Sequence, residues 1–211
     1  MSRYETAARF YDRISGERLL YRRGRETLFA HLGLHKGNRV LVVGCGTGLD
    51  LPLLVEAVGP EGLVVGVDRS LPMLTQARKK VASHGWENIR LIDCDAAALT
   101  DVEPGFDAVV FTYSLSIIEN WRQAWDAALK LLVPGGSVGV VDTDLPSGRA
   151  RMLSPLVVVE MWLGGIDRKR KVWQLIDQAA SPVIHDSLAS GHIQIAVGTV
   201  NPRSIIENEA H

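Results

Sequence analysis

The sequence predicts a doubly wound α/β fold, in which helices cover both faces of a mostly parallel sheet. From Asn38 onward, short apolar runs alternate with longer amphipathic segments. This alternation indicates parallel β-α-β units, because each crossover must cover a sheet face. Near the end of the chain, two more apolar runs flank the turn Ala189-Ser190-Gly191, which is typical of an antiparallel hairpin. Together these runs predict a seven-stranded sheet.

The elements follow in chain order within a single domain, 1–211, because this length suits one domain and is short for two. Residues 1–37 form the expected N-terminal helical cap, since apolar residues recur there at helical spacing. Residues 38–142 form the core, and residues 143–211 add helices and the closing hairpin. The expected strands are Arg39–Val43, Leu63–Val67, Ile89–Ile92, Ala108–Phe111, Val138–Val141, Val183–Leu188 and Ile193–Val200. The expected helices are Leu51–Val58, Pro72–Ser83, Trp121–Leu132, Leu153–Trp162 and Val172–Ala179.

Composition and charge exclude several classes of protein. The formal net charge of −1 gives no overall attraction for nucleic acid, so we expect no nucleic-acid partner. The two cysteines, Cys45 and Cys94, do not stand at a metal-ligand spacing, so we expect no metal site. They also provide no disulfide framework, which favours a cytoplasmic location. No apolar run reaches the roughly 18–20 residues that span a bilayer.

One segment allows a peripheral membrane contact. The apolar stretch Met152–Leu163 precedes four consecutive cations at 168–171. An apolar helix beside such cations can rest on a lipid surface, with the cations against phosphates. The alternative is a core helix followed by a solvated charged face.

A glycine loop follows the first strand directly. It reads Gly44-Cys45-Gly46-Thr47-Gly48 and leads into a helix, so it lies where doubly wound folds bind ligands. Glycine lets the backbone turn sharply and approach a ligand without a Cβ in the way. A dinucleotide fingerprint needs glycine or alanine three residues after Gly46, but that position is Leu49. The spacing G-x-G-x-G therefore disfavours NAD.

Asp68 ends the second strand, twenty residues after Gly48. A carboxylate there can accept two hydrogen bonds from a ribose diol. The alternative is an aspartate that caps the helix beginning near Pro72. Together with the glycine loop, Asp68 favours a nucleoside-containing cofactor.

These residues resemble the class I S-adenosylmethionine-dependent methyltransferases, over roughly Tyr11 to Val141. The run from Val40 to Gly48 resembles their first motif, the run ending at Asp68 their second, and Asp93-Cys94-Asp95-Ala96 their third. The resemblance implies a Rossmann-like fold with S-adenosylmethionine as cofactor, a cofactor-binding core at 38–142 and substrate-side elements after it. The cofactor-binding residues it implies are Tyr11, Gly44, Gly46, Gly48, Asp50, Asp68, Arg69, Met73, Asp95, Ala96 and Tyr113.

A finer resemblance is to small bacterial phospholipid and betaine-lipid N-methyltransferases. The stretches that carry it include Arg9-Phe-Tyr-Asp-Arg13, Gly48-Leu-Asp-Leu-Pro-Leu-Leu54 and Phe111-Thr-Tyr-Ser-Leu-Ser116. It implies a small-molecule or lipid-headgroup acceptor, with an amine preferred over a hydroxyl. The alternative is a protein on the same fold that binds S-adenosylmethionine without methyl transfer, such as a sensor, a partner subunit or a cyclase.

Methyl transfer from a sulfonium requires alignment more than acid–base chemistry. Tyr113, just past the fourth strand, is therefore the candidate catalytic residue, as a pocket wall or amine positioner; the alternative is a packed tyrosine. Tyr11 is expected to fold over the methionyl end or to anchor the first helix. The first motif usually carries an acidic residue at the position of Val42, so we expect Asp50, Tyr11 or a loop carbonyl to compensate.

Overall fold

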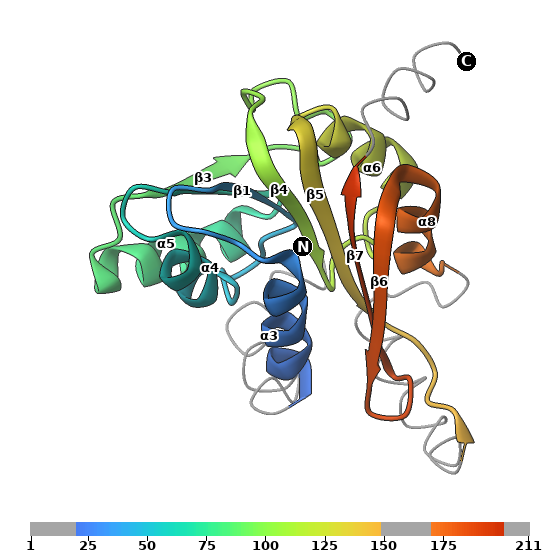
Figure 1. The fold of residues 1–211 in the computed structure, drawn as a ribbon. Coiled ribbons are helices and arrows are strands. Elements are labelled where there is room, and N and C mark those ends of the chain that lie inside the picture. Colours follow the sequence, from blue (N-terminus) through green and yellow to red (C-terminus); the bar gives the residue numbers. More distant parts are fainter. Residues whose placement is uncertain (1–19, 149–169, 201–211) are drawn as a thin grey trace.

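The computed structural model describes residues 20–148 and 170–200 and shows three layers, with a seven-stranded sheet in the middle. The strand order is β3-β2-β1-β4-β5-β7-β6, with β3 at one edge and β6 at the other (Figure 1). The strands are β1 Arg39–Val43, β2 Leu63–Asp68, β3 Ile89–Asp93, β4 Phe106–Thr112, β5 Leu132–Thr143, β6 Ala180–Leu188 and β7 Ile193–Val200.

The first five strands are parallel, and β7 runs antiparallel to both β5 and β6. The predicted mixed sheet with its closing hairpin is therefore confirmed. The strand order reverses between β1 and β4, which pair directly through Val40↔Ala108 and Val42↔Val110. In doubly wound sheets, ligands bind beyond the carboxyl ends of the strands at such a reversal.

Two sets of helices cover the two faces of the sheet. One face carries α3 Leu20–Leu32, α4 Leu51–Val58 and α5 Leu71–His84; the other carries α6 Trp121–Leu129, the 3₁₀ helix η2 Val172–Leu175 and α8 Ile176–Ala179. Successive strand residues alternate between the two faces, so Leu41 and Val43 belong to one buried cluster while Val40 and Val42 belong to the other.

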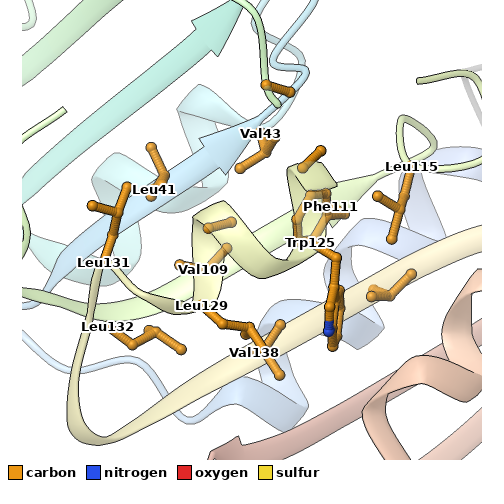
Figure 2. Close-up of a cluster of buried hydrophobic side chains, with 14 of the residues drawn as sticks. Leu41, Val43, Val109, Phe111, Leu115, Trp125, Leu129, Leu131, Leu132 and Val138 are labelled. Atoms are coloured by element: carbon orange, nitrogen blue, oxygen red, sulfur yellow. The ribbon is translucent and has the colours of Figure 1, made fainter. Parts of the chain in front are cut away.

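A cluster of buried apolar side chains packs between α6 and the centre of the sheet. Figure 2 shows Leu41, Val109, Phe111, Trp125 and Val138 in this cluster. Phe111 and Trp125 stack with ring centroids 5.7 Å apart. Each is close to completely buried, and burying a large apolar side chain contributes about 1.5–3 kcal/mol. The ends of β1 and β4, where a ligand would bind, therefore rest on a well-packed base.

The fifth strand begins earlier than the sequence pattern predicts. It starts at Leu132, so α6 ends at Leu129 instead of continuing to Leu132. The register with β4 shifts between Phe106↔Leu132 and Ala108↔Ser137. The segment Pro134-Gly135-Gly136 therefore lies inside the strand, as an irregularity between two paired stretches.

Several expectations fall outside the described residues: the helix at Leu153–Trp162, the apolar stretch that precedes the cations, and the part of the N-terminal helical cap before Leu20. Among the helices at 20–148 and 170–200, none is both long and apolar enough to cross a membrane.

Candidate functional site

The glycine loop turns through three left-handed residues, with φ of +75° at Gly44, +53° at Gly46 and +75° at Gly48. A Cβ on Gly44 would lie 2.6 Å from the Ser114 Cβ, and one on Gly48 would lie 2.6 Å from the Leu51 Cδ1. A Cβ on Gly46 would meet nothing within 4 Å. The outer two glycines thus permit close packing, while Gly46 borders open space.

Asp68 joins the end of β2 to this loop. Its Oδ2 accepts a hydrogen bond of 2.8 Å from the Gly46 N–H, and its Oδ1 accepts one of 2.8 Å from the Ser70 N–H. Burial raises the pKa of Asp68, and these two hydrogen bonds oppose the rise. Ser70, not Asp68, occupies the N-cap position of α5. Because a carboxylate has about four lone-pair sites, Asp68 retains acceptor capacity for a ligand.

The loop, the end of β2 and the residues after β3 and β4 surround one cavity of about 640 Å³. Small-molecule sites typically occupy roughly 300–1,000 Å³. The predicted site residues in its lining are Gly44, Gly46, Asp50, Asp68, Arg69, Met73, Asp95, Ala96 and Tyr113. Gly48 is not part of the lining, because its Cα faces Leu51 and Ala77. Tyr11 lies outside the described residues.

Arg25 also lines the cavity and was not predicted from the sequence. It extends from α3, and its Nε lies 2.8 Å from Oδ1 of Asp50. Both residues are buried, with 6% of Arg25 and 3% of Asp50 exposed. The signal in the sequence is that Arg25 precedes Leu28 and Phe29 by three and four residues, which places a cation on the buried face of its helix.

Tyr113 adopts a left-handed backbone, with φ of +53°. Its hydroxyl donates a 3.0 Å hydrogen bond to the Tyr21 carbonyl, and the two rings meet edge to face at 5.1 Å. The Arg25 guanidinium lies 5.0 Å from its ring centroid. Left-handed non-glycine residues are uncommon and cluster at functional sites. Tyr113 thus forms a wall of the cavity, with its hydroxyl bonded to α3.

Val42 is completely buried among apolar side chains. A carboxylate is nevertheless present nearby, because Oδ2 of Asp50 accepts a 2.5 Å hydrogen bond from the Thr112 hydroxyl at the end of β4. Burial raises the pKa of Asp50, while the Arg25 guanidinium and the Thr112 hydroxyl oppose the rise. Asp50 thus brings a buried acidic group to the ends of the central strands.

A second buried carboxylate supports the wall that follows Tyr113. Asp142, at the end of β5, accepts hydrogen bonds from the Ser116 N–H, the Ser116 hydroxyl and the Thr143 N–H at 2.8–3.2 Å. Burial raises its pKa to about 6. The Arg170 guanidinium donates a 2.6 Å hydrogen bond to the Ile118 carbonyl in the same segment. The contacts of Asp142 and Arg170 thus hold the segment from Ser116 to Ile118, which supplies apolar side chains to the cavity lining.

The histidines of the closing hairpin and the two cysteines differ in their position relative to the cavity. His185 and His192 are not part of the cavity lining; His192 Nδ1 lies 2.6 Å from the Asp144 carbonyl oxygen. Cys45 and Cys94 both line the cavity. Burial raises the pKa of Cys45 well above its usual value and that of Cys94 to about 11. Their thiols are therefore protonated at neutral pH, and a nucleophilic role is disfavoured.

Comparison with known proteins connects this geometry to a family. Residues 40–136 match the family described as "Methyltransferase domain". The chain is 31% identical over 146 residues to the demethylmenaquinone methyltransferase of Listeria monocytogenes and 32% identical over 147 residues to that of Geobacillus kaustophilus. Each match covers 68% of this chain and 62% of the relative, so the chain spans less than two thirds of the length of these relatives.

The methyltransferase family thus matches the part of the chain that carries the glycine loop, Asp68 and Tyr113. The solved structure of an S-adenosylmethionine-dependent methyltransferase from Aquifex aeolicus has the same fold, with a TM-score of 0.68 and 17% identity over 93% of this chain and 98% of that one. The family match and the names of the relatives agree with the predicted methyltransferase class, and the shared fold agrees with S-adenosylmethionine as the predicted cofactor. The finer resemblance to phospholipid N-methyltransferases is not confirmed, since the relatives named above are demethylmenaquinone methyltransferases.

The cavity of the methyltransferase domain fits this cofactor chemically. Asp68 and Asp95 provide acceptors for hydroxyl and amine hydrogens at one end, and the open space beside Gly46 leaves room for a ligand against the backbone. The opposite charges of Arg25 and Asp50 complement an amino-acid zwitterion at the other end. Donors, acceptors and space are thus present for a nucleoside joined to an amino acid.

Proposed function

We propose that this chain transfers the methyl group of S-adenosylmethionine to a small, lipid-soluble ring acceptor of the demethylated quinone type. One observation supports methyl transfer most directly: the glycine loop, Asp68 and Tyr113 border a single cavity. The names of the relatives support the acceptor class. Apolar side chains in the lining support it as well, since Ile117 and Ile118 lie there together with Leu71, which is 55% exposed.

Several of the predicted cofactor-binding residues then have a role at one part of the cofactor. Asp68 binds the ribose diol, and Asp95 with Ala96 contacts the adenine, with Arg69 and Met73 beside them. Gly44 and Gly48 set the loop, and Gly46 lets the ligand approach the backbone. S-adenosylmethionine, when bound, supplies a methyl group on a sulfonium whose leaving thioether needs no proton.

Tyr113 is our candidate for contact with the acceptor. Its hydroxyl is fixed by the hydrogen bond to the Tyr21 carbonyl, and its backbone is fixed by the hydrogen bond from its N–H to the Val141 carbonyl. A fixed ring can orient a planar acceptor, and positioning of this kind is worth up to roughly 7–11 kcal/mol in well-oriented reactions. The Arg25 guanidinium beside the ring disfavours a cationic amine at this position.

An amine of a lipid headgroup is the second candidate acceptor. Glu119 is one of the residues that line the cavity. Its negative charge would attract an ammonium group, whereas a neutral ring acceptor gains nothing from it. Both candidates are compatible with a peripheral membrane contact.

The test is transfer of tritiated methyl from S-adenosylmethionine to three parallel samples: reduced short-chain demethylmenaquinone, phosphatidylethanolamine vesicles and buffer alone. We expect label in the quinone fraction. Label only in the phospholipid would support the amine, and cofactor binding without label in either would favour the non-catalytic alternative.

The cofactor site has its own matched pair of variants. Asp68→Ala should weaken cofactor binding by about 1–3 kcal/mol, the cost of unmet hydrogen bonds. Asp93→Ala is the control, because Asp93 pairs in register with Asp68 in the adjacent strand but is exposed and is not part of the lining. Equal affinities of the two variants would contradict the ribose role.

A further inference from the structure

The chain that follows β4 forms one wall of the cavity in two parts. Ser114 lies against the glycine loop, where its hydroxyl donates a 2.6 Å hydrogen bond to the Val43 carbonyl. Ile117 and Ile118 come next, as half-buried residues that also line the cavity. These two isoleucines, the apolar wall, belong to no helix or strand, so their position depends on the groups that hold this part of the chain.

Two charged side chains hold the apolar wall from distant parts of the sequence. The Asp142 carboxylate, at the end of β5, accepts hydrogen bonds from the Ser116 N–H at 3.2 Å and from the Ser116 hydroxyl at 2.9 Å. Arg170, which precedes η2, donates through Nη1 to the Ile118 carbonyl at 2.6 Å and to the Ser116 carbonyl at 3.4 Å. Ser116 is therefore bonded to a carboxylate on one side and to a guanidinium on the other.

Stability alone does not account for a carboxylate at this position. Asp142 is 1% exposed, and burial raises its pKa to about 6. A raised pKa means that folding favours the neutral acid over the ionised form. What the ionised form adds is two acceptor oxygens, which bond the Ser116 N–H and hydroxyl together with the Thr143 N–H. The carboxylate is thus suited to fixing the chain that leads into the apolar wall.

The apolar wall follows different strands from the groups expected to bind the adenosine. In the strand order β3-β2-β1-β4-β5, Asp68 ends β2 and Asp95 comes just after β3. The apolar wall follows β4, and Asp142 lies near the end of β5. A change at Asp142 or Arg170 should therefore move the apolar wall and leave Asp68 and Asp95 in place.

We propose that Asp142 and Arg170 are positioning residues for the methyl acceptor, because they set where the apolar wall meets the acceptor ring. This assignment rests on the proposed function, which makes the acceptor a lipid-soluble ring. Such a ring gains binding energy by burying its apolar surface against isoleucine side chains. A misplacement of about 1 Å can lower a rate about 100-fold. Loss of either residue should therefore impair acceptor turnover and spare cofactor affinity.

Three variants test the two residues. Asp142→Asn keeps the shape of the side chain but turns one acceptor oxygen into an N–H donor. The N–H groups of Ser116 and Thr143 bond different oxygens, so they can no longer both be matched. Arg170→Met removes the donors to the Ile118 carbonyl and keeps much of the apolar stem. Arg170→Lys restores a cation and a donor at the same place.

Two matched controls change similar side chains that do not hold the apolar wall. Asp144→Asn lies two residues after Asp142, and the Asp144 carboxylate accepts a hydrogen bond from the Leu145 N–H. Arg122→Met removes a guanidinium that lies 4.3 Å from the centroid of the Trp121 ring, the ring that the Arg170 guanidinium faces at 6.0 Å. Neither Asp144 nor Arg122 is part of the cavity lining.

Each protein is assayed for methyl transfer to reduced short-chain demethylmenaquinone, for calorimetric binding of S-adenosylhomocysteine and for Tm. We expect Asp142→Asn and Arg170→Met to lower kcat/KM for the quinone roughly 10- to 100-fold. Both should bind S-adenosylhomocysteine within about twofold of wild type, because the cofactor contacts are distant from the change. Arg170→Lys should recover part of the activity, and the two controls should match wild type.

The outcomes separate this assignment from the proposed function. An unchanged kcat/KM for the quinone in either variant would remove that residue from the assignment. Parallel losses of cofactor affinity and Tm would show that the residue supports the whole fold and does not position the acceptor. If wild type binds S-adenosylhomocysteine but labels no quinone, the proposed function fails, and the assignment fails with it.

Discussion

Gly46 provides a direct test of where the cofactor lies. Its φ of +53° is left-handed, and a Cβ there would meet nothing within 4 Å because it would point into the open space of the cavity. Gly85, at the end of α5, has φ of +64° and equally open surroundings, but it is not part of the lining. The two glycines therefore share a backbone conformation and differ in what lies in front of them.

Alanine at either position should cost the same backbone strain, about 1 kcal/mol. That cost corresponds to a loss of roughly 2–4 °C in Tm for a domain of this size. Only at Gly46 would the added methyl group occupy space that the ligand needs. Overpacking by one methyl group typically costs about 1–3 kcal/mol, which corresponds to roughly 5- to 150-fold in affinity.

The assay combines thermal unfolding with calorimetric titration of S-adenosylhomocysteine for Gly46→Ala, Gly85→Ala and wild type. We expect similar Tm values for the two variants and weaker binding only for Gly46→Ala. Equal affinity of the two variants would refute the idea that the ligand approaches the backbone at Gly46. A much larger loss of Tm for Gly46→Ala would show that the space beside it is filled.

Three further predictions concern the surroundings of the site. Because burial raises the pKa of Asp142 to about 6, its protonation favours the folded state; the free energy of unfolding should fall as pH rises from about 4 to 6, by up to roughly 3 kcal/mol. Asp142→Asn should reduce this slope in urea titrations at stepped pH, leaving the part that comes from Asp50 and Asp68, and an unchanged slope would assign it to other groups. Alanine favours helices over glycine by about 1 kcal/mol, yet Gly24→Ala should lower Tm, because its Cβ would lie 2.1 Å from the Tyr113 hydroxyl oxygen. Adding Tyr113→Phe should recover part of the loss, and failure to do so would contradict this steric cause. Since its pKa is about 11, Cys94 should react with iodoacetamide at pH 8 far more slowly than free cysteine, and more slowly still with S-adenosylhomocysteine bound. Mass spectrometry of the labelled peptide measures this rate, and labelling as fast as that of free cysteine would contradict the prediction.

Elements with a strong apolar period were predictable from the sequence. The bounds Arg39–Val43, Leu51–Val58 and Ile193–Val200 are the same in the sequence pattern and in the structure. Their periodicity is strong because buried parallel strands are apolar on both faces and a covering helix is apolar along one stripe. Local spacing also placed Asp68 at the end of its strand, beside the loop that it bonds.

Features that depend on distant contacts were not predictable in this way. The early start of β5 at Leu132 depends on pairing with Phe106, twenty-six residues earlier in the chain. The position of Arg25 in the cavity depends on Asp50, which the fold brings to it from another helix. A single sequence contains the charge and its helix face, but it does not show which distant residue the charge will contact. Tertiary pairing decides both.

The packing of α3 against β5 and β7 also has a consequence for the order in which the fold can form. Gly24 of this helix lies against Val141 of β5 and Ile193 of β7, and Leu28 packs against Gly139 of β5. α3 thus rests partly on β7, which is synthesised after every other strand of the described sheet. A nascent chain that has not yet reached β7 lacks part of the surface on which α3 docks. Formation of the complete cavity wall should therefore wait until β7 has been synthesised.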